Sequence, residues 1–377
     1  MKKCLAFVLA LALLMTVSAG LADDTIKIGS IGPLTGPYAM YGTGVANAIQ
    51  LAIDEINAKG GLQYELLSED DQGDGELAVN AYNKEMDEGL HILAGTVTSG
   101  ACAAVAAVAN EDRVFLLTPS ASSTTVNEGK DNVFQVCFID PNQGSASADY
   151  IKNNGLAEKV AVIYNNGQDY STGIYQSFVE EAAAIGLEIV STTTFSDDAN
   201  ADFSTQLNDA KNAGADLVYL PIYYTPASAI LQQANNMGYS PIFFGVDGMD
   251  GLLDIEGFDT ALAEGVYVLT PFDANASDDL TVHFVSAYKA AFNDEVPNQF
   301  AADAYDAMYI IDKAFNELGI TAASDPADIC EQMIAWMKTA TYSGLTGTDM
   351  TWNELGQVSK GVTAVVIHDG VYTSVTK

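Results

Sequence analysis

Positive charge is scarce in this sequence. Lysine and arginine together number 15, whereas aspartate and glutamate number 50, and the formal net charge at pH 7 is −35. Proteins that bind nucleic-acid backbones or anionic lipid surfaces use several lysine or arginine contacts, and no cluster of basic residues occurs here. We therefore expect no nucleic-acid partner, and we interpret the acidity as a feature that favours solubility.

Cysteine and histidine are also rare. After Cys4, the cysteines are Cys102, Cys137 and Cys330, and no CxxC pair occurs. The three histidines lie far apart in the sequence. Because zinc sites need clustered thiolates or imidazoles, we expect no metal site. Three cysteines would allow one disulfide whose pairing the sequence does not determine, and we favour buried free thiols.

Only the start of the chain carries a long apolar run. Two lysines precede an apolar stretch over residues 4–17, and small residues follow. This order is typical of a secretory signal peptide, so we expect residues 1–22 to be removed after Ala19 or Ala22. The run is short for a transmembrane helix, which needs about 20 residues. We therefore expect an exported protein with no direct membrane insertion after cleavage.

The motifs of common enzyme classes are missing. Neither the GxSxG elbow of hydrolases nor the GxxxxGK[ST] phosphate loop occurs. Residues 73–78 satisfy GxGxxA, but acidic residues fill and flank this match where a pyrophosphate would lie, so we favour a turn that caps a helix. A serine hydrolase with a distant histidine is the alternative that these absences leave open.

Short β-rich runs alternate with longer helical periods along most of the chain. The predicted strands are residues 25–29, 64–67, 91–94, 114–117, 160–164, 187–190, 217–220, 242–244 and 266–269. The predicted helices are residues 45–58, 76–87, 101–109, 173–185, 203–212, 227–237, 280–292, 301–318 and 327–338. This alternation favours an α/β fold with parallel sheets covered on both faces, and a hairpin is predicted over residues 361–375. A break near residues 140–142 separates two such series, and 377 residues suffice for two cores.

Two hydroxyl-rich segments follow neighbouring predicted strands. They are TVTSG, residues 96–100, and LTPSASSTT, residues 117–125. Open α/β sheets bind ligands at the carboxyl ends of their strands, and the N–H groups at a helix N-terminus favour an anion. We therefore predict that Ser99 and Ser122 together hold one carboxylate, and that both segments form the floor of a pocket for a small polar ligand.

The stretch IKIGSIGPLTGPYAMYGTGVANAIQLAIDEINAKGGL resembles the start of the substrate-binding proteins of branched-chain amino-acid ABC importers. The likeness continues in order through SEDDQGD, FLLTPSASS, NNGQDYSTG, DFSTQL, GADLVYLPIYYTPASAILQQANNMGY and TWNELGQ. It implies a type I periplasmic binding protein fold, with two doubly wound parallel-sheet lobes joined by three hinge crossings. Lobe 1 would comprise residues 24–139 and 271–344, and lobe 2 would comprise residues 140–270 and 345–377.

The resemblance also implies the positions that contact the ligand, which fall in both lobes. They are Ser99, Ser120, Ser122, Tyr170, Tyr223, Asp247 and Tyr41. Ser99 and Ser122 would bind the α-carboxylate of an amino acid, whereas the Ser120 carbonyl and Asp247 would bind its ammonium. The two tyrosines of lobe 2 would supply aromatic contacts, and Tyr41 would form a wall of the side-chain pocket. Such an arrangement suits a zwitterion with an apolar side chain.

Several assignments have alternatives nearby in the sequence. Ser99 would also serve as the N-cap of the helix that follows it. Tyr38 is a rival for the aromatic wall, and Asp250 and Asp254 are rivals for Asp247.

The sequence departs from the family pattern at three positions. Asp247 stands where several members have glutamate, which is longer by one methylene. Gly73 and Thr98 stand where some members have a cysteine pair, so that bridge is absent and Thr98 makes the pocket more polar. Because family members also bind amides and aromatic acids, these changes leave the identity of the ligand open.

Together, the residues and the resemblance predict an exported solute-binding protein without catalytic activity or a cofactor. We expect it to act as a monomer, to capture a small aliphatic or branched-chain amino acid, and to deliver it to the membrane permease of an ABC importer. Ligand binding would select the closed state that the permease recognises. Two alternatives stay open: a sensor module for another small amide or carboxylate, and a secreted serine amidase.

Overall fold

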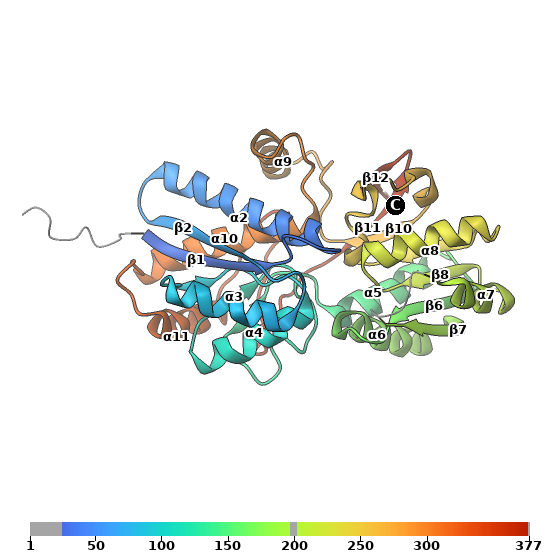
Figure 1. The fold of residues 1–377 in the computed structure, drawn as a ribbon, viewed down its shortest axis with the longest axis horizontal. Coiled ribbons are helices and arrows are strands. Elements are labelled where there is room, and N and C mark those ends of the chain that lie inside the picture. Colours follow the sequence, from blue (N-terminus) through green and yellow to red (C-terminus); the bar gives the residue numbers. More distant parts are fainter. Residues whose placement is uncertain (1–24, 197–201, 376–377) are drawn as a thin grey trace, which may run out of the picture.

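The protein has two α/β lobes that lie end to end along its long axis (Figure 1). The computed structural model describes residues 25–196 and 202–375, and the predicted signal peptide, residues 1–22, lies outside them. Each lobe is built around its own sheet, so the predicted α/β class with two parallel-sheet lobes is confirmed. Within the described residues, no helix combines the length and the apolar character that crossing a membrane requires.

The first lobe has a five-stranded parallel sheet in the order β2-β1-β3-β4-β5. Its strands are β1 (Thr25–Gly32), β2 (Gln63–Asp70), β3 (Ile92–Leu93), β4 (Leu116–Thr118) and β5 (Val133–Gln135). Its helices are α2 (Ala39–Lys59), α3 (Gly75–Asp87), α4 (Ser99–Glu111), α9 (Asp279–Ala291), α10 (Gln299–Leu318) and α11 (Pro326–Met337). Helices α2 and α10 cover one face of the sheet, and α3 and α4 cover the other (Figure 1).

Both faces of this sheet are buried because the side chains of β1 alternate between two apolar clusters. Ile26 and Ile28 pack in the cluster that contains Ile49 of α2. Ile31 packs on the opposite face, in the cluster that contains Val105 of α4. Residues 28–32 of β1 are therefore all buried, as is typical of a central parallel strand.

The second lobe has a seven-stranded sheet in the order β12-β11-β10-β9-β8-β6-β7. Its strands are β6 (Lys159–Asn165), β7 (Glu188–Phe195), β8 (Leu217–Leu220), β9 (Ile242–Gly245), β10 (Tyr267–Thr270), β11 (Thr363–His368) and β12 (Val371–Ser374). Its helices are α5 (Asp140–Asn153), α6 (Asp169–Ile185), α7 (Ser204–Asn212) and α8 (Tyr224–Asn236), with 3₁₀ turns η1 (Asp247–Met249), η2 (Leu252–Asp254) and η3 (Thr260–Ala263). Strands β11 and β12 pair antiparallel, which confirms the predicted C-terminal hairpin.

The two sheets share one strand order apart from this hairpin. The order β7-β6-β8-β9-β10 repeats the order β2-β1-β3-β4-β5. In each sheet the chain reverses its direction of winding beside the first strand, β1 or β6. Ligands of open α/β sheets bind at that reversal, outside the carboxyl ends of the strands. The topology therefore directs attention to the loops after β1, β3, β6, β8 and β9.

Strand β5 and helix α5 were not predicted from the sequence. Helix α5 buries small and polar residues, among them Gln143, Gly144 and Ser147, so it lacks the apolar period that identifies a helix. Gly144 lets α5 approach α6 closely: a β-carbon at this position would lie 2.4 Å from the Ile174 carbonyl oxygen and 2.6 Å from the Phe178 nitrogen. Close backbone packing therefore holds this helix in place of large apolar side chains.

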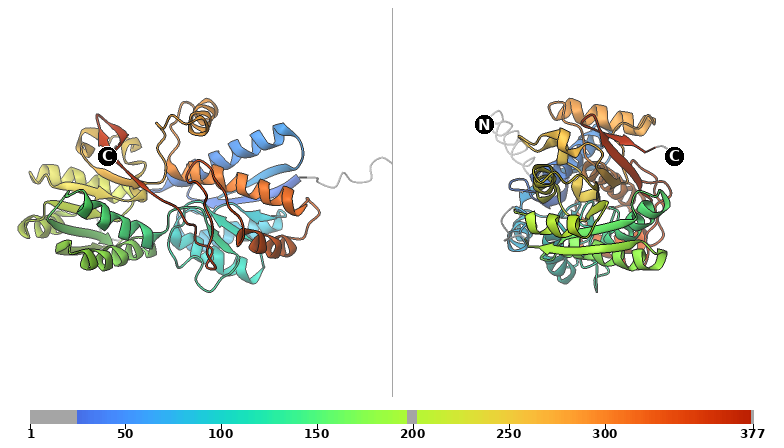
Figure 2. Two further views of the ribbon diagram at one scale, coloured as in Figure 1. Left: turned by 180° about the vertical axis from the view of Figure 1, so that it is seen from behind. Right: turned by 90° about the vertical axis from the view of Figure 1, so that its right-hand side faces the viewer.

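The third crossing between the lobes lies later than the predicted residue 344. Residues 342–358 pack on the edge strand β5, where the Trp352 indole donates a hydrogen bond to the Gln135 carbonyl at 2.8 Å. The Gln135 nitrogen in turn donates to the Gly356 carbonyl at 2.9 Å. This segment satisfies an otherwise open sheet edge, so it belongs with the first lobe. The red C-terminal segment then runs across to β11 in the second lobe (Figure 2).

Three cysteines lie in the described part of the chain, and all are buried free thiols, as predicted. Burial raises the pKa of the Cys102 thiol to about 12. The pKa of the Cys330 thiol also rises to about 12 for the same reason. Thiols with such values are almost wholly protonated at neutral pH and therefore unreactive.

Candidate functional site

A small cavity of about 10 Å³ lies between the two lobes, at the carboxyl ends of both sheets. We call it the interlobe cavity. It is lined by nine residues: Tyr41, Val97, Thr98, Ser99, Ser120, Tyr170, Tyr223, Asp247 and Phe300. The structure thus brings six of the seven predicted site residues together and leaves Ser122 outside the lining.

The first lobe contributes the two hydroxyl loops, which hydrogen bonds hold side by side. The Ser123 nitrogen donates to Ser99 Oγ at 3.2 Å, and Thr118 Oγ1 donates to the Thr96 carbonyl at 2.8 Å. Thr118 Oγ1 also accepts a hydrogen bond from the Ala121 nitrogen at 2.9 Å. The loops after β3 and β4 therefore form one rigid surface beneath the cavity.

The N-terminus of α4 lies at this surface and borders the cavity. Ser99 is the first residue of α4, and Thr98, not Ser99, is its N-cap and makes no side-chain cap bond. Thr98 Oγ1 is buried and has no hydrogen-bond partner among the residues that the structure describes. A helix N-terminus without a capping side chain offers its N–H groups to an anion. This corner of the cavity is therefore suited to a carboxylate.

Ser122 is bonded through its backbone to the first crossing and is not among the residues that line the interlobe cavity. Its carbonyl accepts a hydrogen bond from the nitrogen of Asp140, the first residue of α5, at 3.0 Å. Ser122 is buried, with an exposed fraction of 1%. The chain turns between Ser120 and Ser122, so only the first of these two serines reaches the lining.

Asp247 lies on the opposite side of the cavity, at the start of η1. The Tyr170 hydroxyl donates to its Oδ1 at 2.5 Å, and Gln143 Nε2 donates to its Oδ2 at 2.8 Å. Burial raises the pKa of the Asp247 carboxyl to about 7, although these two hydrogen bonds lower it. Within the part of the chain that the structure describes, no lysine, arginine or histidine lines the cavity. An uncompensated buried carboxylate of this kind favours a cationic group on a ligand.

The rival residues named from the sequence lie elsewhere. Asp250 Oδ2 accepts a hydrogen bond from the Gln299 nitrogen at 2.8 Å, and neither Asp250 nor Asp254 lines the interlobe cavity. The Tyr38 ring lies 4.8 Å from the Tyr223 ring but is also absent from the lining. Among residues 25–196 and 202–375, Asp247 is thus the only acidic residue that lines this cavity.

Aromatic rings form the remaining walls. Tyr170 and Tyr223 stack with ring centroids 4.6 Å apart, and the Tyr41 ring lies 4.8 Å from the Phe300 ring. Gly248 leaves room for this packing, because a β-carbon there would lie 2.4 Å from the Tyr170 hydroxyl. Together with Val97, these rings supply the apolar part of the cavity.

The lobes are closed over the cavity by hydrogen bonds between them. The Tyr41 hydroxyl of the first lobe donates to the Gly248 carbonyl of the second lobe at 2.5 Å. Thr225 Oγ1 donates to the Pro37 carbonyl at 2.9 Å, and Thr125 Oγ1 donates to Asp169 Oδ2 at 3.2 Å. These contacts would break if the lobes separated, so they belong to the closed state.

Four lining or supporting residues were not assigned a ligand contact from the sequence: Val97, Thr98, Phe300 and Gln143. Val97 lies within the hydroxyl loop and could have been included by its position beside Ser99. Phe300 and Gln143 come from distant helices, and no local signal in the sequence marks them. Only the packing of α5 and α10 brings these side chains to Asp247 and Tyr41.

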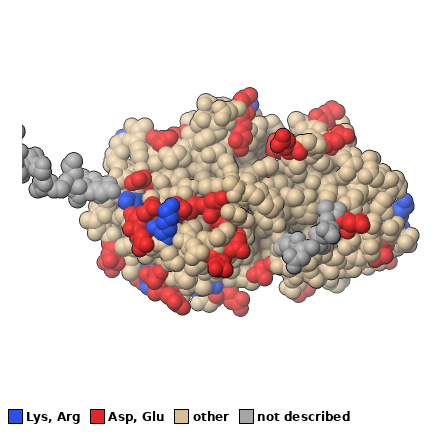
Figure 3. Space-filling view, in the orientation of Figure 1, with Lys and Arg blue, Asp and Glu red and all other residues tan. Residues whose placement is uncertain are grey.

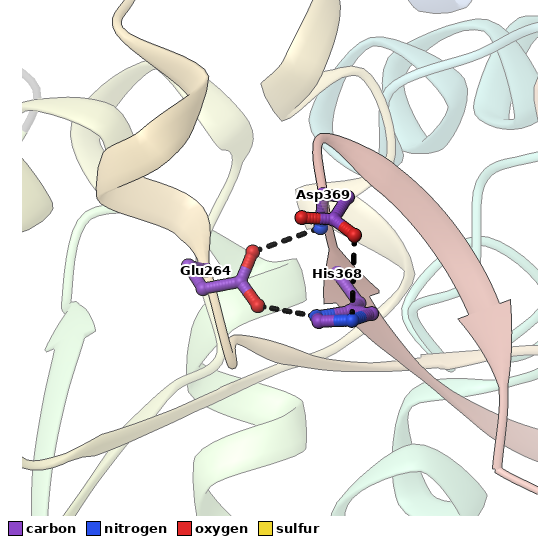
Figure 4. Close-up of side chains that lie close together, drawn as sticks. All are labelled: Glu264, His368 and Asp369. Atoms are coloured by element: carbon purple, nitrogen blue, oxygen red, sulfur yellow. Dashed lines mark hydrogen bonds and ion pairs between the residues drawn. The ribbon is translucent and has the colours of Figure 1, made fainter.

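One group of possible metal ligands occurs in the part of the chain that is described: Glu264, His368 and Asp369 (Figure 4). All three are exposed. His368 Nδ1 lies 2.5 Å from Glu264 Oε1, whereas its Nε2 lies 3.5 Å from Asp369 Oδ2. The two ring nitrogens therefore face different carboxylates, which is the arrangement of an ion-pair cluster. The bond to Glu264 raises the pKa of His368.

Residues 25–370 match the family whose members are described as periplasmic binding proteins. The chain belongs to this family. The Leu/Ile/Val-binding protein BraC3 of Rhizobium johnstonii is 31% identical over 307 residues, which cover 80% of this chain and 82% of that relative.

Solved structures resemble this periplasmic binding protein over nearly the whole chain. The leucine-binding protein LivK of Thermotoga maritima is 29% identical with a TM-score of 0.83, over 93% of this chain and 98% of that chain. The branched-chain amino acid transporter substrate-binding protein LivJ of Streptococcus pneumoniae, solved with isoleucine, is 30% identical with a TM-score of 0.83 and the same coverage. These likenesses confirm the predicted fold class and the family resemblance.

Proposed function

We propose that this periplasmic binding protein captures a branched-chain or other small aliphatic amino acid outside the cytoplasm and delivers it to the permease of an ABC importer. The observation that carries the proposal is that one cavity has a buried carboxylate on one side and a helix N-terminus on the other. Asp247 lies on one side, uncompensated by any cationic residue of the lining, and the uncapped N-terminus of α4 lies on the other. The family members BraC3, LivK and LivJ support it through the ligands in their names.

The ammonium of the amino acid would bind to Asp247. The carboxylate oxygens of Asp247 already accept hydrogen bonds from Tyr170 and Gln143, which hold the Asp247 side chain in one orientation. Closure excludes water from the cavity and strengthens the attraction between opposite charges. The Ser120 carbonyl would accept a further hydrogen bond from the same ammonium, as the family pattern implies.

The α-carboxylate would bind at the N-terminus of α4. Thr98 Oγ1 is the unpartnered donor in this corner, and Ser99 lies beside it. The side chain of the ligand would then contact Val97, Tyr41 and Phe300. Because this wall is apolar, it favours aliphatic over polar side chains.

The lining also supports binding without catalysis. Ser99 and Ser120 are the serines of the cavity, and none of the described residues that line it is a histidine or lysine that could act as their general base. A fluorophosphonate probe tests this point directly. Stoichiometric labelling of either serine would favour the amidase alternative, and we expect none.

The central experiment measures ligand stabilisation of refolded protein that has been stripped of bound ligand. Thermal shifts are recorded with the twenty amino acids, and with 4-methylpentanoate, which lacks the ammonium. A ligand at 100 times its dissociation constant adds about 2.7 kcal/mol to the free energy of unfolding. We expect shifts with leucine, isoleucine or valine and none with 4-methylpentanoate. A cooperative melt that no amino acid shifts would overturn the proposal.

We also propose that the protein acts as a monomer, since a binding cavity between two lobes of one chain needs no second copy. Light scattering at working concentration tests this state. A dimer mass that persists on dilution would contradict it.

A further inference from the structure

A second cavity, which we call the hinge cavity, lies beside the crossings between the lobes. It has an open mouth and a volume of about 250 Å³. Its walls come from both lobes: Asp250 and Val268 belong to the second lobe, whereas Val296 and Gln299 belong to the first. It shares no lining residue with the interlobe cavity. The proposed function makes no use of this space.

The walls of the hinge cavity offer apolar surface that remains open to solvent. Val268 and Phe272 form its buried side. Val296 and Val371 line it as well, and they are 56% and 55% exposed. A single exposed valine needs no explanation, but two such valines at one cavity provide an apolar surface that a ligand would cover.

The charged groups of this cavity are all acidic. Asp250, Asp254 and Asp273 line it, and no lysine, arginine or histidine does. None of the three takes part in an ion pair among residues 25–196 and 202–375. Figure 3 shows how few basic side chains accompany the acidic ones on one face of the molecule. Field lines from three carboxylates in one concave surface attract cations.

The three carboxylates differ in the hydrogen bonds that they accept from the protein. Asp250 accepts a hydrogen bond from the Gln299 nitrogen at 2.8 Å, and Asp273 accepts one from the Asn275 nitrogen at 2.8 Å as well as one from Ser374. Burial raises the pKa of the Asp250 carboxyl to about 6. A positive charge in the cavity would offset this cost.

We propose that the hinge cavity is a second ligand site, and that it takes a small organic cation with a primary ammonium on a short aliphatic chain. The ammonium would bind among Asp250, Asp254 and Asp273, and the chain would lie on Val296 and Val371. An amino acid does not suit this site, because its carboxylate would face three aspartates without a cationic partner. A bare metal ion would leave the apolar walls uncovered.

The probe is n-pentylamine, with 1-pentanol and pentanoate as neutral and anionic molecules of the same length. Binding is measured by calorimetry on the Asp247→Asn variant, which lacks the carboxylate that would attract an ammonium in the interlobe cavity, and on the wild type saturated with isoleucine. We expect pentylamine to bind at least about tenfold more tightly than pentanol, and pentanoate more weakly than either. Equal affinities for the three molecules would overturn the proposal.

Variants locate the binding. Asp254→Asn changes an exposed residue without altering side-chain volume, and together with Asp273→Asn it should weaken pentylamine binding at least about tenfold. Val371→Lys places a competing ammonium at the rim and should abolish it. The matched control Asp209→Asn changes an exposed carboxylate on α7 and should have no effect.

The outcomes separate this proposal from the function of the interlobe cavity. Pentylamine binding that Asp247→Asn abolishes and Asp254→Asn leaves intact would assign the amine to the interlobe cavity and overturn the proposal. If the wild type does not bind isoleucine but pentylamine binding still depends on Asp254 and Asp273, only the proposed function is overturned. Single Asp254→Asn protein keeps the test valid if the double variant does not fold.

Discussion

Ligand affinity should fall steeply as the pH drops from 7 to 5, because the ammonium of an amino acid needs the ionised form of Asp247. Burial raises the pKa of this carboxyl to about 7 in the ligand-free protein. About half of the molecules therefore carry the carboxylate at pH 7, and about one in a hundred at pH 5. The affinity for isoleucine should fall about 50-fold, which corresponds to about 2.3 kcal/mol.

Calorimetry with isoleucine at pH 7, 6 and 5, at constant ionic strength, measures this dependence. The control is Asp247→Asn, which keeps the shape of the side chain but does not titrate. Asp250 and Asp303, whose pKa values burial raises to about 6, remain in both proteins, so the difference between the two slopes isolates Asp247. A wild-type affinity that changes less than about threefold, or an identical slope in the variant, would refute the reasoning.

The stability of the ligand-free protein should change in the opposite sense. The pKa of Asp247 is higher in the folded protein than the ordinary value of 3.8, so the folded state keeps its proton longer. Its contribution to stability is complete below about pH 4 and is lost as the pH rises through about 7. Ligand-free protein should therefore melt at a lower temperature at pH 7 than at pH 5, and Asp247→Asn should reduce the difference.

Three further predictions concern closure, the thiols and the helix interface. Tyr41→Phe removes the hydroxyl that donates to the Gly248 carbonyl across the lobes. The affinity for isoleucine, measured by calorimetry, should therefore fall about fivefold, with the melting temperature nearly unchanged. An unaltered affinity would show that this bond does not stabilise the closed state. In protein that lacks residues 1–22, a thiol reagent such as DTNB should label none of Cys102, Cys137 and Cys330 in the native state and all three after denaturation, and rapid labelling of folded protein would contradict their burial. Gly144→Ala should lower the free energy of unfolding in urea by about 1–3 kcal/mol, because the added β-carbon meets the backbone of α6. Gly361→Ala is the control and should not lower it, because a β-carbon there meets nothing within 4 Å. Equal stabilities of the two variants would contradict the close packing.

Local sequence pattern was sufficient where an element is both regular and apolar. Residues 217–220 are four consecutive β-forming or apolar residues between turn signals, and β8 has the predicted bounds. Helix α5 shows the opposite case, since most of its buried residues are small or polar and Ile151 is the one large apolar residue among those buried in this helix. A pattern of apolar residues does not reveal a helix that packs through its backbone.

The candidate site divides in the same way. Ser99, Tyr170 and Asp247 were named from short motifs that resemble a family, and the structure brings them to one cavity. Ser122 was named by the same reasoning but lies outside the lining, because the direction of a side chain after a strand depends on the turn that follows. Phe300 had no local signal at all, since its partner Tyr41 lies far away in the sequence.

The sequence by itself determined the alternation of strands and helices and the division into two series, because these follow from local periodicity. The groups expected to bind a zwitterion came from the resemblance to a known family. Only the tertiary structure decided which of three nearby aspartates faces the interlobe cavity, where the third crossing lies, and that a separate acidic cavity opens at the hinge. Each of these depends on contacts between segments distant in the chain. Burial, charge compensation and the satisfaction of a sheet edge are properties of the assembled lobes, so no single stretch of sequence contains them.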